Sequence, residues 1–246
     1  MPHEFELRKQ VTLQATPEQV WEAIATGPGA DSWFMGRNEI EPRVGGSARQ
    51  YFGDFPPSEA TVTAWEPARR FAFRSPESPE GLFMAFEYLI EGRGQGTTVL
   101  RLVQSGVLGD DWESEYDALR RGWDLYLHSL GQYLAHFPGR TATVVFGARP
   151  SAGGAEPAWE VLERGLGLAG PVSAGDRVRL TPEGLPPVEG VADYVAPGFL
   201  GVRTGDALYR FILGMHDTLV IGHHLFAPAD AEESEHAWQA WLGKLA

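Results

Sequence analysis

The two halves of this 246-residue chain carry the same landmarks in the same order. A Trp-Glu-x-φ-x-x-Gly-x-Gly run, in which φ is aliphatic, begins at Trp21 and begins again 138 residues later at Trp159. An aromatic-aliphatic helix pattern that contains Trp123 returns 115 residues later at Trp238. Internal repetition decides the architecture before any single residue does. Because the matches lie at opposite ends of both halves, we infer a tandem duplication.

The second copy is shorter, since the spacing between the copies falls from 138 to 115 residues. Between the two helices, residues 61–74 correspond to 191–203, and residues 98–104 correspond to 218–224. These segments alternate or run in β-branched and aromatic residues and are broken by Pro and Gly, as antiparallel strands are. Each copy therefore predicts a strand, a helix, several strands and a second helix. We expect an α+β fold with domains at 1–138 and 139–246.

Two helices can be placed from local signals. Thr16 is suited to the N-cap, Pro17 to the first helical position, and Gln19 to the reciprocal capping-box position. A long helix is predicted to begin near residues 114–116, after an acidic run at 110–117 that favours a helix N-terminus. Its apolar face carries Leu119, Trp123, Tyr126, Leu127, Leu130 and Leu134. Such a face must be covered by a sheet or be left to bind something.

Composition excludes several classes of protein. The net charge is −13, with both halves acidic, so binding to a nucleic-acid backbone is not expected. There is no Cys, which excludes disulfides and thiol nucleophiles and favours a reducing cytoplasm. No apolar run approaches the ~18 residues of a membrane span, and the first residues do not resemble a signal peptide. We therefore expect a cytoplasmic bacterial protein with no membrane span.

The first half resembles the START-like (SRPBCC) superfamily, and more narrowly its branch of polyketide cyclases and activator-of-heat-shock-ATPase homologues. The resemblance covers nearly all of residues 5–137. It rests on residues 15–24, Trp33-Phe34, Gly45-Gly46, Trp65-Glu66-Pro67 with Phe71, Gly96-Thr97-Thr98 with Leu100, and Gly122-Trp123 with Leu127, Leu130 and Leu134. It implies a helix-grip fold, in which an antiparallel sheet wraps around the long C-terminal helix, often with a hydrophobic cavity between them.

The second half departs from the family pattern. It has no Trp-Phe pair, and the Pro-rich segment 181–187 stands where ordered strands would run. We interpret it as a degenerate helix-grip domain with a smaller sheet.

Family membership implies binding of a small apolar or amphipathic molecule, without choosing among lipid carriers, hormone receptors, cyclases and co-chaperone-like proteins. The residues that we expect at the ligand are aromatic, polar or aliphatic side chains of the first half. They are Trp33, Phe34, Arg49, Tyr51, Phe71, Phe73, Phe86, Tyr88, Gln104, Trp123, Tyr126 and Leu127. The alternative is that each aromatic residue simply fills a close-packed core.

Polar residues on strands are more informative, because their burial costs free energy unless they find partners. Gln104 shares a strand face with Leu100 and Leu102, so its amide should point into the apolar interior. His224 is its counterpart by sequence spacing, and of the adjacent His223 and His224 at most one can point inward. Arg49 and Tyr51 share a strand face, where Arg49 either anchors a ligand carboxylate or phenolate or is exposed to solvent.

No nucleophile and base appear in a recognisable pattern, and we expect no metal and no cofactor. The leading hypothesis is binding of a small hydrophobic molecule by the first domain, without catalysis. The alternatives are a cyclase or aromatase-like enzyme, in which cavity shape folds a reactive chain, and a co-chaperone-like module that binds proteins. A protein partner or a homodimer is compatible with all three.

Overall fold

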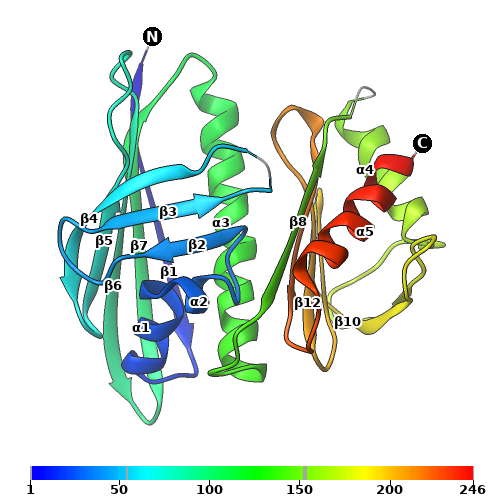
Figure 1. Ribbon diagram of the computed structural model, residues 1–246, viewed down its shortest axis with the longest axis horizontal. Helices are drawn as coiled ribbons and strands as arrows, with labels where there is room; N and C mark the ends of the chain where they lie inside the picture. Colours follow the sequence, from blue (N-terminus) through cyan, green and yellow to red (C-terminus); the bar gives the residue numbers. More distant parts are fainter. Residues whose placement is uncertain (1, 54, 152–153, 246) are drawn as a thin grey trace. The chain divides into compact units, whose positions relative to one another are not determined.

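The computed structural model describes residues 2–53, 55–151 and 154–245 (Figure 1). The chain divides into two compact units, residues 1–141 and residues 142–246. Within the described residues, no helix is long and apolar enough to cross a membrane.

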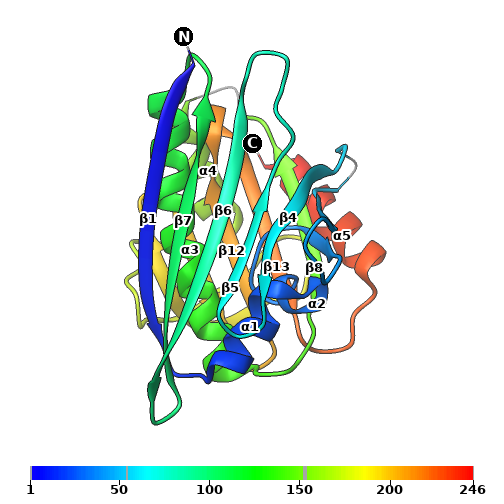
Figure 2. The same ribbon diagram turned by 90° about the vertical axis from the view of Figure 1, so that its left-hand side faces the viewer.

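The first unit is a seven-stranded antiparallel sheet that is covered on one face by a long helix, as Figure 2 shows for β1, β7 and β6 in front of α3. The strands follow the order β1-β7-β6-β5-β4-β3-β2. Their bounds are β1 His3–Leu13, β2 Arg37–Ile40, β3 Ser47–Tyr51, β4 Ser58–Glu66, β5 Arg70–Arg74, β6 Phe83–Gly94 and β7 Thr97–Leu108. The helices are α1 Pro17–Ala25, α2 Gly27–Ala30 and α3 Trp112–His136. This is the helix-grip arrangement that the sequence predicted.

Local capping explains where α1 begins. The backbone N–H of Gln19 donates to Thr16 Oγ1, and the backbone N–H of Thr16 donates to Gln19 Oε1 at 2.9 Å. Two of the N–H groups that a helix start leaves unpaired are satisfied in this way, and Pro17 has none to satisfy. The predicted capping box is confirmed. The long helix α3 begins at Trp112, two residues before the predicted range.

The second unit repeats this topology with one strand fewer. Its sheet has the order β8-β13-β12-β11-β10-β9, which matches the first sheet strand for strand without a counterpart of β2. Its strands are β8 Thr143–Arg149, β9 Arg177–Leu180, β10 Val188–Ala196, β11 Phe199–Arg203, β12 Ala207–Leu213 and β13 Leu219–Leu225. Its helices are α4 Ala155–Gly165, the short η1 Met215–Asp217 and α5 Ala231–Lys244. Trp159 lies on α4 as Trp21 lies on α1, and Trp238 lies on α5 as Trp123 lies on α3, which confirms the duplication.

The repeat extends to individual backbone hydrogen bonds at a spacing of 130 residues. The N–H of Gly45 donates to the carbonyl oxygen of Val62, and the N–H of Gly175 donates to that of Ala192, both at 2.8 Å. Both glycines have a positive φ, 77° and 97°. The pairing of β4 with β5 shifts just after Val62, and that of β10 with β11 shifts just after Ala192. Such bulges bend a sheet at a defined point, so both sheets bend at the same place.

The shortening of the second copy is spread over several connections. The spacing falls from 138 residues at α1 to 130 at Gly45, because β2 has no counterpart. It is 129 at the Phe71 and Leu200 strand pair, and 115 at the final helices. The largest loss lies between β11 and β13, since β12 and β13 have seven residues each where β6 and β7 have twelve. The second sheet is therefore both narrower and shorter.

The turn between β4 and β5 gives a test of this duplicated backbone. Ala68 has φ 56° in this turn, and the second copy has Gly198 with φ 75° at the equivalent position. The left-handed conformation costs an L-residue roughly 1–2 kcal/mol, and Gly avoids this strain. Gly also increases the conformational entropy of the unfolded chain, which offsets part of the stabilisation. Ala68→Gly should therefore leave the free energy of unfolding unchanged or raise it by up to about 1 kcal/mol.

Urea denaturation of both variants provides the measurement. The control is Ala64→Gly in the buried middle of β4, which should lower the free energy of unfolding by about 1 kcal/mol or more. If Ala68→Gly is as destabilising as Ala64→Gly, the strain assigned to this turn is absent.

Candidate functional site

Trp123 lies at the centre of an aromatic cluster in the first unit. It projects from the middle of α3 and is 4% exposed. Its ring is stacked on Phe34 with centroids 5.4 Å apart. The rings of Phe86, Tyr88 and Tyr126 surround it at centroid distances of 6.2–6.3 Å. The fold therefore brings together side chains from α3, β6 and the segment after α2.

The cluster continues along the sheet through β5. Phe73 is stacked on Phe86 at 4.8 Å, and Phe71 contacts both Phe73 and Tyr88. Phe71 is 1% exposed and also meets Trp21 and Trp65, which close the end of the cluster near α1. Eight of the predicted residues are thus in one connected group, namely Trp33, Phe34, Phe71, Phe73, Phe86, Tyr88, Trp123 and Tyr126.

Gln104 joins this cluster through a hydrogen bond to its central residue. The indole Nε1–H of Trp123 donates to Gln104 Oε1 at 2.6 Å, and Gln104 is 1% exposed. The Gln104 Nε2 group donates to the sulfur of Met84 at 3.1 Å. The strand alternation thus correctly placed this amide in the interior, and its polar atoms link β7 to α3 and to β6.

Two tyrosines of the cluster stay protonated over a wide pH range. Burial raises the pKa of Tyr88 and of Tyr126 well above the ordinary value, because the phenolate would lose its hydration. The Tyr126 hydroxyl donates to the sulfur of Met35 at 3.2 Å. These phenols can therefore act as hydrogen-bond donors and are poor proton acceptors near neutral pH.

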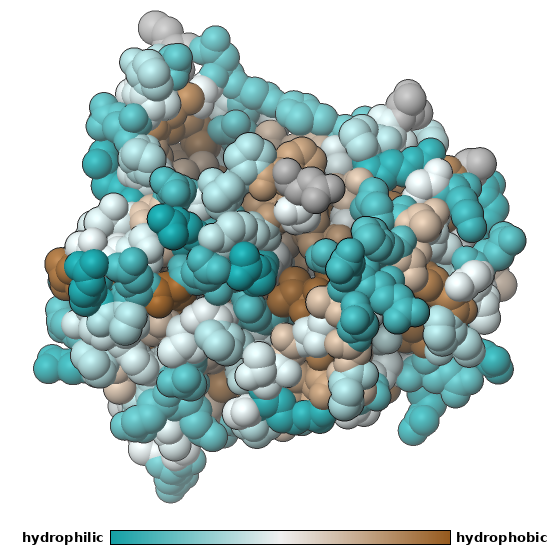
Figure 3. All heavy atoms as spheres, viewed as in Figure 1, coloured by the Kyte–Doolittle hydropathy of each residue, from teal (hydrophilic) through white to brown (hydrophobic). Residues whose placement is uncertain are grey.

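Several inward-facing side chains of the first unit keep solvent-accessible surface. Phe73, Met84 and Phe86 on the sheet and Tyr126 on the helix are half-buried, although their partners Phe71, Trp123 and Gln104 are buried. Figure 3 shows apolar atoms set back behind a hydrophilic rim in the upper left of the view, where Figure 1 places the sheet and the first turns of α3. We use the term recess for the space between the sheet and α3 that Phe73, Met84, Phe86 and Tyr126 border with their accessible surface.

Two of the predicted site residues have positions that packing alone explains. Trp33 is 2% exposed, and its Nε1–H donates to the carbonyl oxygen of Ala23 in α1 at 2.8 Å, which ties this loop to the helix. Leu127 is 6% exposed on the buried face of α3, beside Leu130 at 0%.

Arg49 and Tyr51 share a strand face as expected, but it is the outer face of β3. The inward residues of this strand are Ala48 and Gln50. Arg49 pairs with Glu59 across β4 at 3.2 Å, and the Tyr51 hydroxyl donates to Glu39 Oε2 at 2.8 Å. The structure therefore does not bring these two residues to the aromatic cluster.

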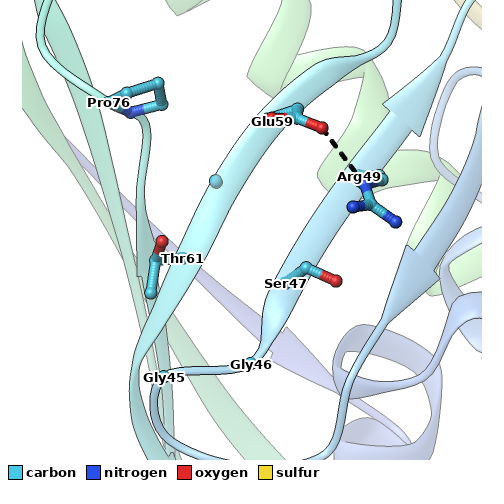
Figure 4. Close-up of a pocket in the computed structure, with 8 residues that line it drawn as sticks. Gly45, Gly46, Ser47, Arg49, Glu59, Thr61 and Pro76 are labelled. Carbon is cyan, nitrogen blue, oxygen red and sulfur yellow. Dashed lines mark hydrogen bonds and ion pairs between the residues drawn. The ribbon is translucent and has the colours of Figure 1, made fainter.

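Arg49 borders a separate shallow pocket of about 230 Å³ (Figure 4). The second copy repeats its ion pair, because Arg179 and Glu189 lie 3.4 Å apart at the same spacing of 130 residues. An exposed cross-strand pair of this kind contributes little to stability. Its recurrence marks it as a feature of the duplicated sheet rather than of a site in the first unit, and the spacing was visible in the sequence.

The inward polar residue of the second unit is His223, so the assignment of His224 as the counterpart of Gln104 was wrong by one residue. The His223 ring lies 4.4 Å from Trp238, the counterpart of Trp123, and also contacts Tyr209 and Phe211. A slip of one residue moves a strand side chain to the other face. The correct spacing at this strand is 119 residues, because the preceding connections of the second copy are shorter.

His223 is held in its neutral form. Its Nδ1 accepts the backbone N–H of Arg210 at 3.1 Å, so the ring proton belongs on Nε2, which has no hydrogen-bond partner among the described residues. Burial lowers the pKa of His223 well below its ordinary value, and the nearby His224 and Arg210 act in the same direction. Arg210 itself is buried in a bidentate pair with Asp193, with N–O distances of 3.0 and 2.9 Å.

In the described part of the chain, no group of three or more His, Asp or Glu side chains is arranged to hold a metal ion. The acidic run at 110–117 surrounds the start of α3, where Glu113 and Glu115 lie in the first turn. Negative charge at this end of a helix is favoured by the exposed N–H groups.

Residues 14–135 match the family of activator of Hsp90 ATPase homolog 1-like proteins. The first unit therefore belongs to this branch of the START-like superfamily. A comparison with curated protein sequences found no significant match for the chain.

Three solved structures of similar fold differ in how much of this chain they cover. A protein from Mesorhizobium loti is 22% identical, with 54% of this chain and 98% of that chain covered and a TM-score of 0.48. DynU16, a protein of the dynemicin biosynthetic locus, is 21% identical, with 97% and 96% covered and a TM-score of 0.46. The Aha1 dimer from Colwellia psychrerythraea is 19% identical, with 53% and 96% covered and a TM-score of 0.44.

The neutral state of His223 predicts a pH dependence of stability. The pKa of His223 is depressed in the folded state. Below about pH 6.5 this residue therefore binds a proton in the unfolded chain while it stays neutral in the folded chain. The contribution of His223 to the free energy of unfolding is fully present above this pH. It is lost as the pH falls, by up to about 1.4 kcal/mol per pH unit.

His223→Gln should remove this contribution, so its free energy of unfolding should fall less steeply than that of the unmodified protein between about pH 6.5 and 5. Urea denaturation over this range is the measurement. The control is His236→Gln on the exposed side of α5, which should leave the slope unchanged. Equal slopes for all three proteins would show that His223 is not held neutral.

Proposed function

We propose that the first unit binds a small apolar or amphipathic molecule in the recess between its sheet and α3, without converting it. The observation that carries this proposal is the accessible surface kept by Phe73, Phe86 and Tyr126, although all three face the interior of the unit. Apolar side chains that face inward are normally close-packed. Concave sites lined by aromatic side chains with a few fixed polar groups are the usual form of small-molecule sites.

The contrast with the second unit supports this assignment. There the counterparts of Phe73 and Tyr126 are closed, since Val202 on β11 is 0% exposed and Trp241 on α5 is 3% exposed. Tyr209, the counterpart of Phe86, is half-buried, so the second unit encloses two of the three positions at which the first has half-buried rings. We assign binding to a first domain at 1–138 and not to the second domain at 139–246.

The polar groups at the recess favour binding over catalysis. Gln104 does not titrate near neutral pH, and Tyr126 stays protonated because burial raises its pKa. A general base must accept a proton close to the working pH. These side chains can orient a ligand oxygen, and they cannot take up a proton from a substrate.

A filling substitution tests the position of the site. Leu119 is half-buried and lies one helical turn before Trp123 on the same face of α3. Leu119→Trp should occupy the recess and reduce the uptake of the fluorescent probe N-phenyl-1-naphthylamine by about tenfold or more, at a cost of no more than roughly 1–3 kcal/mol in stability.

Fluorescence titration and thermal unfolding give the two measurements for this variant. The matched control is Leu119→Met, which conserves volume and should keep both uptake and melting temperature. Undiminished uptake by a folded Leu119→Trp protein would place the probe elsewhere and contradict the proposed site.

Native mass spectrometry tests whether the bound molecule is converted. Freshly purified protein should retain a small molecule that is absent from the Leu119→Trp variant. After incubation at neutral pH the released molecule should keep its mass, because neither Gln104 nor the protonated Tyr126 can act as a base. A change of mass that requires the folded protein would instead support a cyclase-like enzyme.

A further inference from the structure

The amide of Gln104 has a fixed orientation. The indole N–H of Trp123 can only donate, so the Gln104 atom that lies 2.6 Å from it must be the carbonyl oxygen. The NH₂ group is then directed to the opposite side, where its acceptor among the described residues is the sulfur of Met84 at 3.1 Å. Trp123 therefore holds Gln104 as a donor that faces away from the helix.

Sulfur is a poor partner for this donor. A thioether accepts hydrogen bonds weakly, whereas a buried amide N–H usually finds an oxygen. Gln50 provides a comparison within the same unit, because its Nε2 donates to the backbone carbonyl oxygen of Met35 at 2.6 Å. An amide buried to 1% exposure, whose acceptor in the described part of the chain is a thioether, retains much of its capacity to bind an oxygen.

Three features allow the Met84 side chain to move aside for a ligand. Met84 is half-buried, and the residue opposite it on β7 is Gly106, which has no side chain to hold it in place. Methionine has three rotatable side-chain bonds and adapts to irregular spaces at low cost. The next inward residue of β6 is Phe86, opposite Gln104, so a ligand that moves Met84 aside meets an aromatic ring.

A second inward donor with a sulfur acceptor lies on α3, one helical turn after Trp123. The Tyr126 hydroxyl also donates to a thioether, that of Met35 at 3.2 Å, and the Tyr126 ring meets those of Phe34 and Trp123 edge to face. Flat surfaces flank both donors, since Phe34 is stacked on Trp123 with 13° between the planes and Phe73 is stacked on Phe86 with 24°.

We propose that the first unit selects flat ring systems that carry an oxygen acceptor, such as an aryl ketone, and that the ligand oxygen replaces the Met84 sulfur on the Gln104 amide. This inference rests on the proposed function, because it requires the recess to bind a ligand. It adds the chemical class of the ligand and the residue that recognises it.

Fluorenone and fluorene form a matched pair of probes for this proposal. They share one planar ring system and differ at a single position, which is a carbonyl group in fluorenone and a methylene group in fluorene. Quenching of tryptophan fluorescence and calorimetric titration should show that the unmodified protein binds fluorenone about five to ten times more tightly, as expected for one hydrogen bond in a buried site.

Two variants of the donor and its acceptor sharpen the test. Gln104→Leu removes the donor, so the ratio of the two affinities should fall to about one. Met84→Leu removes the competing sulfur and nearly conserves volume, so the affinity for fluorenone should stay or rise by a few fold while that for fluorene stays unchanged. The control is Gln50→Leu, which removes an amide that already has a carbonyl partner and should keep the preference for fluorenone.

The outcomes separate this inference from the proposed function. If neither probe binds any of the proteins, the binding function itself fails. If both probes bind the unmodified protein with equal affinity, the function stands and the role of Gln104 is overturned. Equal gains for both probes in Met84→Leu would also overturn it, since Met84 would then act by volume alone. Circular dichroism of each variant establishes that it is folded, and Gln104→Met replaces Gln104→Leu if the latter does not fold.

Discussion

The hydrogen bond from Trp123 to Gln104 determines how the first sheet and its helix face each other. It is a short contact of 2.6 Å between a donor on α3 and an acceptor on β7, and both groups are almost fully buried. Losing either partner would leave a polar group unpaired in an apolar interior, which costs about 1–3 kcal/mol. The contact also fixes the indole ring around which Phe34, Phe86, Tyr88 and Tyr126 are arranged. The geometry of the aromatic cluster therefore depends on one polar pair.

The second copy shows what happens to this arrangement when the chain around it shortens. Trp238 keeps its place on the helix, and the strand position opposite it is still polar, but the residue is His223 and it faces the indole through its ring. The counterparts of Tyr116 and Leu119 at the spacing of the final helices are Ala231 and Ser234, and α5 begins only at Ala231. The first turns of the long helix, which border the recess in the first unit, are thus reduced. A more closed core follows, with His223 neutral inside it.

Much of the fold was predictable because it depends on strong local signals and on repetition. The capping box at Thr16, the strand breaks at Pro67 and Pro197 and the repeated tryptophans indicate the correct elements without any tertiary information. The faces of Gln104 and Leu127 also followed from strand and helix periodicity. The error at His224 arose because the lost residues are distributed over several connections, so no single spacing applies to the whole repeat. For Arg49, the pairing with Glu59 on the outer face could have been inferred from Arg179 and Glu189.

The partners of the buried donors could not be predicted, because they depend on side-chain positions that only tertiary packing defines. Sequence periodicity places Gln104 and Tyr126 inside, and it does not reveal that each meets a methionine sulfur instead of an oxygen. The register of the second sheet makes the difference between the copies clear. Ala207 pairs with Leu225 where Met84 pairs with Gly106, so the second copy has no thioether at this position and its inward donor, Nε2 of His223, is enclosed by aromatic rings. The same fold thus holds one polar donor against a methionine side chain and the other among aromatic rings, and we assign the ligand to the first of these arrangements.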